Sequence, residues 1–361
     1  MRGLNRLALT LLLVLSAAAV FGASALAADP CLTIGMLMGG AKNDAGYNQS
    51  HYDALMEVQR NLPCVNVVVA EYVSDSEAES VMETMIQQGA KLIIAAGFPF
   101  QYPAIAVAAR HPDVKFIHPG GWEVRANFGN YFAKTQQTFF LMGVAAGMMT
   151  KTNKLGFVAG MPLGFTLGNI NGFHLGARAV NPNVETRLVY TFSWGDTTKE
   201  AAATQALIDQ GCDVITMHLD SPIAVLQTAE AAGVYSIGFM SLESQQFAPT
   251  GWITGLGLTW GDFYTQNAQK VIDGTWAPGF IRMGLAEGFL EIAPFGPSVP
   301  QNVQEFVLSV TEGFKAGLLN PFTGPIKDQN GVVRIAEGEA WGNEKMGDFD
   351  WLVEGIIGSP Q

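Results

Sequence analysis

Gly89-Ala90-Lys91-Leu92-Ile93-Ile94 and Gly211-Cys212-Asp213-Val214-Ile215-Thr216 are two similar stretches, and they decide the fold class of this chain. In each stretch a glycine stands where a helix is expected to end, and an apolar run follows shortly after it. Glycine readily adopts the left-handed conformation that closes a helix, and a short apolar run is typical of a strand that is buried on both faces. Each stretch therefore predicts a helix that leads into a buried strand, and their similarity indicates two related α/β halves.

The same alternation of strand and helix continues on both sides of these stretches. The candidate strands are Leu32–Met38, Val65–Tyr72, Leu92–Ala95, Lys115–His118, Leu155–Ala159, Thr186–Tyr190, Val214–Met217 and Tyr235–Gly238. The amphipathic stretches between them that predict helices are Asn48–Asn61, Ser76–Gln88, Tyr102–His111, Thr166–Val180, Thr198–Gln210 and Ile223–Ala232. Strands that alternate with helices predict doubly wound parallel sheets.

The chain is expected to divide into two lobes. The first is predicted to span residues 28–149 and the second residues 150–255, with part of 256–285 crossing back to the first and part of 286–361 belonging to the second. This last part of the chain holds one predicted helix, Asp262–Asp273, and irregular segments rich in glycine and proline. A chain of this length is long for one core and suits two.

Residues 1–27 have the three-part pattern of a cleavable signal peptide. Arg2 and Arg6 form a positive region, Leu7–Phe21 is an apolar run without charge, and Ala25-Leu26-Ala27 supplies the small residues that a signal peptidase reads. The run is short for a membrane span. We therefore expect an exported chain, and an uncleaved membrane anchor is the alternative.

A lipid anchor is a second alternative, because Cys31 closely follows the predicted leader. However, Asp29 and Pro30 precede this cysteine, whereas a lipobox needs small residues there. We therefore expect a freely soluble mature chain that begins near Ala28 and carries no lipid.

Three cysteines occur in the chain. Cys31 and Cys64 each stand directly before a predicted strand, so that both lie at the same sheet edge if the two strands are neighbours. In an oxidising compartment this geometry permits a disulfide, and the sequence equally permits two free thiols. Cys212 is predicted to pack as a small buried apolar side chain. No cysteine has the spacing of a metal ligand.

The chain is acidic, with a formal net charge of −12 and 14% charged residues. Such a balance argues against nucleic acid or an anionic membrane surface as a partner. After the leader, no segment is long and apolar enough to span a bilayer, and the short apolar region from Phe139 to Met149 suits a core helix.

Ligands of open parallel sheets bind beyond the carboxyl ends of the strands, so the residues that follow each predicted strand are candidate contacts. These residues are aromatic side chains with a few carboxylates and amides, which suit stacking on a flat ring and hydrogen bonding to its edge. The predicted contacts are Asp44, Tyr47, Asn48, Phe98, Phe100, Trp122, Phe165, Trp194, Asp220, Met240 and Trp260. The alternative is that the aromatic residues cover a hydrophobic seam between the lobes.

Catalytic motifs are absent or incomplete. There is no Gly-x-Ser-x-Gly elbow and no phosphate-binding P-loop, and Gly39-Gly40 lacks the third glycine of a dinucleotide fingerprint. His118 and His218 end strands in different halves, but they lack the local spacing of a metal pair. Asp220 has no evident nucleophile or partner acid beside it. The sequence predicts a binding protein that is not an enzyme, with no cofactor and no metal.

Asp44-Ala45-Gly46-Tyr47-Asn48-Gln49 resembles the Asp-x-x-Phe-Asn-Gln segment of the basic membrane protein family, the PnrA-like substrate-binding proteins of ABC transporters. Further stretches resemble the family in the same order: Gly172–Pro182, Ala206–Ile215, His218–Pro222 and Trp260–Tyr264. The last two are similar to a branch that includes adenine-type binders. The resemblance covers nearly all of the chain after the leader.

The resemblance implies a type I periplasmic-binding-protein fold, in which three crossovers join two α/β lobes that close around a ligand. The family's usual ligands are purine nucleosides or related bases, and one branch binds riboflavin. By this resemblance Asp44 and Asn48 hydrogen-bond the ligand, Tyr47 stacks on it, and Asp220 binds it from the second lobe. The implied partner of such a monomeric receptor is an ABC permease in the inner membrane.

Two departures from the family pattern bear on the ligand. Gly238-Phe239-Met240-Ser241 stands where many relatives have an aspartate, and Trp260 lies near the place where many nucleoside binders have a lysine. Fewer charged groups would then face the ligand, which weakens ribose recognition and favours a flat ring such as a free base. We expect a purine base or purine nucleoside, with another heteroaromatic such as riboflavin as the alternative.

Two other classes of function stay open. A sensory receptor would present the same ligand to a membrane kinase, and the sequence carries no partner motif that separates it from a transport receptor. A secreted nucleoside hydrolase would use Asp44 and Asp220. Because a receptor without a lipid anchor stays near its permease only in an enclosed compartment, we expect the periplasm of a double-membraned bacterium.

Overall fold

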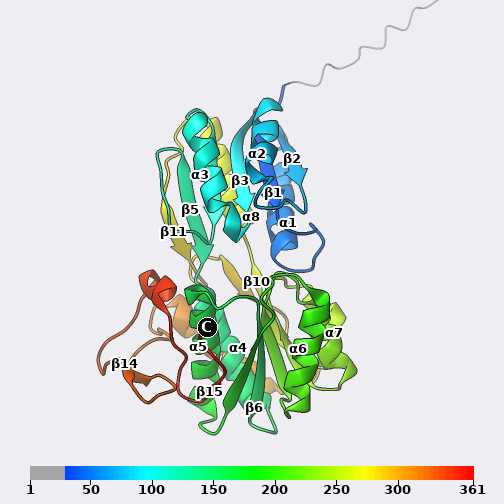
Figure 1. The fold of residues 1–361 in the computed structure, drawn as a ribbon, viewed down its shortest axis with the longest axis vertical. Helices are drawn as coiled ribbons and strands as arrows, with labels where there is room; N and C mark the ends of the chain where they lie inside the picture. The colour runs from blue at the N-terminus through cyan, green and yellow to red at the C-terminus, as the bar shows by residue number, and fades with distance from the viewer. Residues whose placement is uncertain (1–28) are drawn as a thin grey trace, which may run out of the picture.

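The computed structural model describes residues 29–361, and the predicted signal peptide lies outside the described residues. Two lobes lie end to end and are joined by a narrower waist (Figure 1). Each lobe has a sheet at its centre with helices packed on it. This arrangement confirms the predicted pair of doubly wound parallel-sheet lobes.

The first lobe holds a six-stranded parallel sheet in the order β11-β5-β4-β3-β1-β2. Its strands are β1 Leu32–Met38, β2 Val65–Ala70, β3 Ala90–Ala96, β4 Lys115–Pro119, β5 Phe128–Ala133 and β11 Phe280–Met283. Its helices pack in pairs, α1 Tyr47–Asn61 with α8 Gly261–Ile272 and α2 Ala78–Gln87 with α3 Gln101–Arg110. The interior strand β1 is buried along its whole length, as its largely apolar sequence predicts.

The second lobe holds a seven-stranded sheet in the order β12-β10-β9-β8-β6-β7-β15, in which β12 alone pairs in an antiparallel sense. Its strands are β6 Lys154–Ala159, β7 Glu185–Tyr190, β8 Val214–His218, β9 Tyr235–Gly238, β10 Trp252–Leu258, β12 Leu290–Ile292 and β15 Ile356–Ile357. Its helices are α4 Thr135–Met149, α5 Gly164–Val180, α6 Thr197–Asp209, α7 Ile223–Ala231 and α9 Gln301–Lys315. The order β7-β6-β8-β9-β10 repeats the order β2-β1-β3-β4-β5 of the first lobe, so the two similar sequence stretches occupy corresponding strands, β3 and β8.

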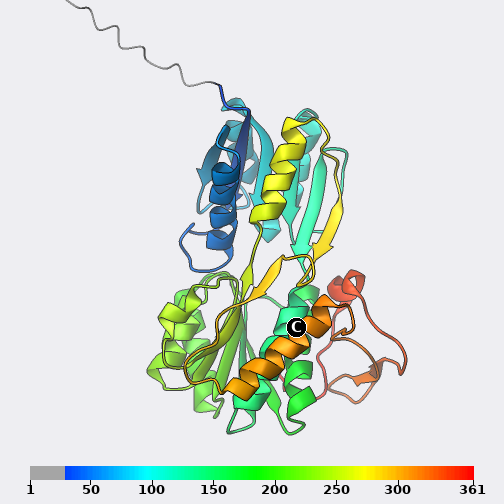
Figure 2. The same ribbon diagram turned by 180° about the vertical axis from the view of Figure 1, so that it is seen from behind.

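Within the described residues the chain crosses between the lobes three times, from β5 to α4, from β10 to α8 and from β11 to β12 (Figure 2). Helix α4 packs against α5, α9 and β10, so it lies with the second sheet. The sequence division after Met149 placed this helix in the first lobe. Almost every face of α4 is buried, and such a helix has no polar side from which the sequence could tell which lobe covers it.

Residues 316–361, which we call the C-terminal segment, run along the side of the second lobe (orange to red in Figures 1 and 2). This segment contains β13 Ile326–Lys327, β14 Val333–Ile335, the 3-10 helix η3 Asn343–Asp348 and β15 at the edge of the second sheet. Its buried aromatic rings contact one another and comprise Phe322, Phe349 and Trp351. The η3 turn packs on α5.

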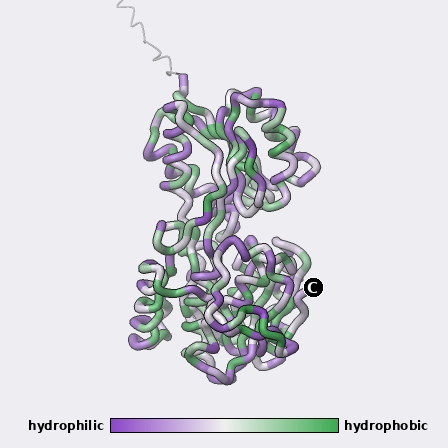
Figure 3. Tube along the Cα trace, turned by 90° about the vertical axis from the view of Figure 1, so that its left-hand side faces the viewer, coloured by the Kyte–Doolittle hydropathy of each residue, from purple (hydrophilic) through white to green (hydrophobic). Residues whose placement is uncertain are grey.

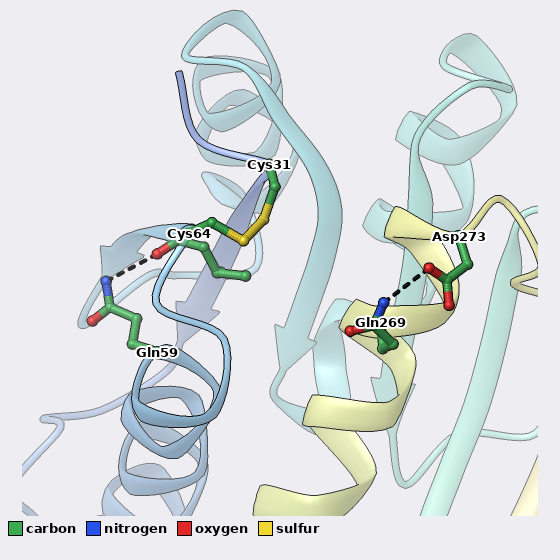
Figure 4. Close-up of a disulfide and its surroundings, with 6 residues drawn as sticks. Cys31, Gln59, Cys64, Gln269 and Asp273 are labelled. Carbon is green, nitrogen blue, oxygen red and sulfur yellow. Dashed lines mark hydrogen bonds between the residues drawn. A yellow bond between two sulfur atoms is a disulfide. The ribbon is translucent and has the colours of Figure 1, made fainter. Parts of the chain in front are cut away.

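Cys31 and Cys64 form a disulfide at the beginnings of β1 and β2, with their Cα atoms 5.4 Å apart (Figure 4). Beside it, the side-chain amide of Gln59 donates to the carbonyl of Val65 at 3.4 Å. The bridge spans a sequence separation of 33 residues, and constraining a loop of this length in the unfolded chain stabilises a protein by about 3 to 4 kcal/mol. Cys212 is buried and unbridged.

Apolar and polar residues are interspersed along the chain in both lobes (Figure 3). Among the residues that the structure describes, no helix combines the length and the apolar character that a bilayer crossing requires.

Candidate ligand-binding site

A cavity of about 560 Å³ lies between the two lobes. Its walls come from segments that follow strands of both sheets: Gly39–Ala41 after β1, Gly97–Phe100 after β3, Ser193–Gly195 after β7 and Asp220–Ser221 after β8. The carboxyl ends of the two sheets therefore face the same space, as the rule for open parallel sheets predicts. Its volume lies in the range of small-molecule sites.

The cavity gathers most of the predicted contact residues. Those that line it are Asp44, Tyr47, Asn48, Phe98, Phe100, Phe165, Trp194, Asp220 and Met240. Trp122 and Trp260 are not among the lining residues, and the structure places both elsewhere.

Trp122 is 56% exposed and lies against Phe98, and it lines a neighbouring hollow together with residues of the C-terminal segment. Trp260 is fully buried, with its ring parallel to that of His51 at a centroid distance of 5.2 Å. The chain crosses to the first lobe directly after β10, and Trp260, two residues beyond this strand, packs against His51 of α1 and Tyr131 of β5. A position after a strand does not place Trp260 in the cavity, because the chain leaves the second lobe directly after this strand.

Aromatic rings from both lobes form one side of the cavity. Phe98 comes from the first lobe, and its ring centroid lies 5.5 Å from that of Phe165 in the second. The planes of Phe165 and Trp194 are within 12° of parallel, with centroids 6.3 Å apart. Trp194 lies over Gly160, where an added Cβ would be 2.5 Å from the indole. These faces suit a flat ligand ring.

The polar wall of the first lobe is an internally bonded network around Asp44. One carboxylate oxygen of Asp44 accepts from the backbone N–H groups of Gly46 (2.9 Å) and Gln49 (3.0 Å). The other oxygen accepts from Asn48, through both its backbone N–H (3.1 Å) and its side-chain amide (2.7 Å). Asn48 in turn accepts from the backbone of Gly40 at 3.2 Å. Burial raises the pKa of Asp44, and these hydrogen bonds oppose the shift. Asp44 therefore satisfies the free N–H groups at the start of α1.

The polar wall of the second lobe has unused hydrogen-bonding capacity. The carboxyl group of Asp220 has no hydrogen-bond partner among the described residues, and burial, with Asp44 and Glu200 nearby, raises the pKa of Asp220 to about 8. In Glu200, Oε1 accepts from the backbone N–H of Asp196 at 2.9 Å, while Oε2 is buried without a partner among the described residues. Burial raises the pKa of Glu200 to about 7.

Several lining residues escaped the sequence analysis: Tyr72, Asp75, Phe132, Ser193 and Glu200. Tyr72 and Asp75 follow β2, which ends at Ala70, two residues before the predicted end. Glu200 lies inside α6, where its spacing from Asp196 indicates only a helix cap. The sequence signal for Glu200 is its spacing from Asp196. A glutamate that accepts from the backbone of Asp196 points toward the start of α6, and therefore toward the edge of the sheet.

His218 lines the cavity, and the side-chain amide of Asn169 donates to its Nδ1 at 3.2 Å. Burial lowers the pKa of His218 to about 3, so the ring is neutral. His118 does not line the cavity. Within residues 29–361 no group of three or more histidine, cysteine or acidic side chains has the arrangement of a metal site.

The two lobes touch beside the cavity at the start of α1. The backbone N–H of Tyr47 donates to the carbonyl of Asp220 at 2.7 Å, and the hydroxyl of Ser221 donates to the carbonyl of Asp44 at 2.7 Å. Only glycine fits at position 46, because a Cβ there would lie 1.9 Å from the carbonyl oxygen of Asp220. The lobes are therefore in direct contact beside the cavity.

Comparison with known proteins adds a family and two sequence relatives. The family described as ABC transporter substrate-binding protein, PnrA-like, matches residues 31–314. A purine-binding protein of Brucella abortus is 34% identical over 331 residues, which cover 91% of this chain and 94% of that protein. A putative ABC transporter glucose-binding protein of Haloferax volcanii is 32% identical over 269 residues, covering 74% of this chain and 68% of that protein.

Solved structures of solute-binding proteins share the fold. An ABC transporter solute-binding protein from Aeropyrum pernix K1 superimposes with a TM-score of 0.71 at 18% identity, covering 88% of this chain and 96% of that one. One from Conexibacter woesei has a TM-score of 0.68 at 24% identity, covering 80% and 98%. The C-terminal segment lies beyond the residues that the family matches.

Proposed function

The chain belongs to the PnrA-like family of ABC transporter substrate-binding proteins, and we propose that it captures a purine base or purine nucleoside in the cavity between its lobes. Proteins of this family bind a solute for a transporter and are not enzymes. The observation that carries the proposal is the cavity, whose walls combine aromatic rings from both lobes with carboxyl groups that have free hydrogen-bonding capacity. A flat ring with N–H groups on its edge complements both features.

The purine-binding relative from Brucella abortus supports this ligand class, because the similarity extends over 91% of the chain. A second relative is described as a putative glucose-binding protein, so a sugar belongs among the competing ligands. The near-parallel Phe165 and Trp194 favour the flat purine.

Capture proceeds by closure of the lobes about the three crossing segments, with no bond broken. A ligand that contacts both walls stabilises the closed arrangement over the open one, and only this difference in affinity shifts the equilibrium. The contacts of Tyr47 with Asp220 and of Ser221 with Asp44 form only when the lobes meet. The closed receptor then delivers its ligand to an ABC permease in the inner membrane.

The proposed setting is the periplasm, with the protein acting as a monomer that carries no lipid. The disulfide supports an oxidising compartment. It also engages the sulfur of Cys31, which is the cysteine that a lipid anchor would use.

A thermal-shift screen tests the ligand class. A bound ligand at a hundred times its Kd stabilises a protein by about 2.7 kcal/mol, which raises Tm by several degrees. We expect adenine, hypoxanthine or their nucleosides to raise Tm, and glucose and riboflavin to leave it unchanged. The absence of a shift with every purine overturns the proposal, and a shift with riboflavin or glucose alone replaces the purine with that ligand.

Trp194→Ala tests the position of the site. Loss of the ring face is expected to weaken purine binding more than about tenfold, measured by calorimetry. The matched control is Trp122→Ala, which removes an indole that does not line the cavity and is expected to leave the affinity unchanged. Equal affinities of the two variants would show that the ligand does not contact Trp194.

A further inference from the structure

Two carboxyl groups of the second lobe line the cavity with oxygen atoms that have no hydrogen-bond partner among the described residues. Asp220 has no hydrogen-bond partner for its side chain, and Oε2 of Glu200 is buried and unpartnered. Buried polar groups normally find partners, and an unpaired carboxyl in an enclosed site costs free energy. A ligand that supplies the missing partners removes this cost on binding.

The charge of the cavity limits what that ligand can be. Its lining includes the carboxyl groups of Asp44, Asp75, Glu200 and Asp220, and it includes no lysine or arginine. An anionic ligand such as a nucleotide would therefore meet only like charges. A neutral ligand that carries hydrogen-bond donors would instead find carboxyl oxygens that can accept from it.

On the basis of the proposed function, we infer that Glu200 and Asp220, which both line the cavity, hold one proton between them, on Asp220, and recognise the amino-substituted edge of a 6-aminopurine. The backbone N–H of Asp196 donates to Glu200, and a donated hydrogen bond favours the ionised form of a carboxyl. No donor reaches Asp220, and its neighbours are carboxyl groups, so the proton stays there. Glu200 then accepts from the exocyclic amino group, and Asp220 donates to the adjacent ring nitrogen.

The other titratable groups around the pair leave this assignment in place. Asp44 faces it from the first lobe with both oxygens bonded to the start of α1, and the buried ring of His218 is neutral. Lys199 pairs with Asp196 at 3.2 Å and does not line the cavity. Burial raises the pKa of Glu200 to about 7 and of Asp220 to about 8, so both carboxyl groups titrate near neutral pH.

The pair predicts a bell-shaped dependence of affinity on pH. In acid both carboxyl groups are protonated and the acceptor is lost, whereas in base both are ionised and the donor is lost. Adenine is expected to bind most tightly between these limits. Adenosine monophosphate is expected not to bind, because its phosphate meets carboxylates without a cation.

Glu200→Gln tests the assignment directly. Its side-chain oxygen can still accept from Asp196, and its amide nitrogen then places a donor where Glu200 had an acceptor. We expect the ratio of adenine to hypoxanthine affinity, measured by calorimetry, to fall at least about tenfold. The loss of adenine affinity in acid is also expected to disappear, because glutamine does not titrate. The matched control is Glu243→Gln, which removes an exposed carboxylate of the same lobe outside this cavity and is expected to change neither quantity.

The outcomes separate the acid pair from the proposed function. If wild-type protein binds purines but Glu200→Gln keeps the same ratio and the same pH profile, the acid pair is refuted and the purine receptor stands. If no purine binds wild-type protein, both are refuted. Should the variant fail to fold, the wild-type profile decides, since an adenine affinity that is constant between about pH 5 and 9 refutes the assignment of one protonated and one ionised carboxyl group.

Discussion

Asp44 and Asp220 lie on opposite walls of the same cavity, and their carboxyl groups have different surroundings. Asp44 accepts four hydrogen bonds from the start of α1, whereas Asp220 accepts none from the described chain. The polar groups of the first wall thus hydrogen-bond one another, whereas the carboxyl group of the second wall is free to hydrogen-bond a ligand. The comparison teaches that two carboxyl groups that both lie beyond strands differ in their hydrogen-bond partners, and that these partners separate a group that supports the fold from one that is free for a ligand.

The largest expected effect is at the place where the two walls meet. Gly46→Ala introduces a Cβ at 1.9 Å from the carbonyl oxygen of Asp220, a backbone atom that has little freedom to move. The closed arrangement is then blocked, and purine affinity is expected to fall about a hundredfold, or about 2.7 kcal/mol by calorimetry. Gly347→Ala is the control, since a Cβ there meets no atom within 4 Å. An unchanged affinity of Gly46→Ala would show that ligand binding does not need this contact.

Asp44→Ala is expected to destabilise the protein by about 2 kcal/mol in urea unfolding, because it leaves the first N–H groups of α1 without their acceptor. The effect belongs to the free protein and needs no ligand. A variant as stable as the wild type would contradict the supporting role of this wall.

Asp220→Ala is expected to reverse this pattern. It weakens purine binding by about tenfold or more, or about 1.4 kcal/mol, because a hydrogen bond to the ligand is lost. The stability of the free protein at neutral pH changes little or rises, since the side chain has no partner to lose. Calorimetry and urea unfolding on the same preparation measure both quantities. If Asp220→Ala lost as much stability as Asp44→Ala, the two carboxyl groups would not differ in their support of the fold.

The pH dependence of stability tests the same comparison between the two walls, with only a small change expected over any one pH unit. The folded protein raises the pKa of Asp220 from 3.8 to about 8, so it holds a proton that the unfolded chain releases at lower pH. The free energy of unfolding that this group contributes is fully present below the unfolded pKa and is lost as the pH rises toward the folded value. The stability of the wild type relative to Asp220→Ala should therefore fall between pH 4 and 8, by no more than about 1.4 kcal/mol for each pH unit.

Four buried histidines change the free energy of unfolding with pH in the opposite direction, and their contribution is removed by comparing the two proteins. Burial lowers the pKa values of His51, His118, His174 and His218 to about 3 or 4, so these rings lower the stability as the pH falls below 6.5. Both proteins contain them, and their effect cancels in the difference. A difference that is independent of pH would show that Asp220 titrates normally in the folded state.

Much of the fold could be predicted from the sequence, because strand, helix and glycine signals are local. The similar stretches at Gly89 and Gly211 do enter corresponding strands of two matching sheets. Cys31 and Cys64, each placed directly before a strand, do meet at one sheet edge. Helix α4 was predicted in the first lobe but packs in the second. Its apolar surface predicts that the helix is buried and does not indicate which sheet covers it.

The sequence by itself determined the two-lobed α/β architecture and the edge of the sheets where a ligand can bind, since both follow from the order and period of neighbouring residues. Only the tertiary structure decided which groups at that edge are left free. Asp44 accepts hydrogen bonds from its own helix, Trp260 is stacked on His51, and Glu200 and Asp220 line the cavity with unpaired carboxyl oxygens. The physical reason is that hydrogen-bond satisfaction and burial depend on groups distant in the chain, and their positions exist only once the lobes have folded and closed.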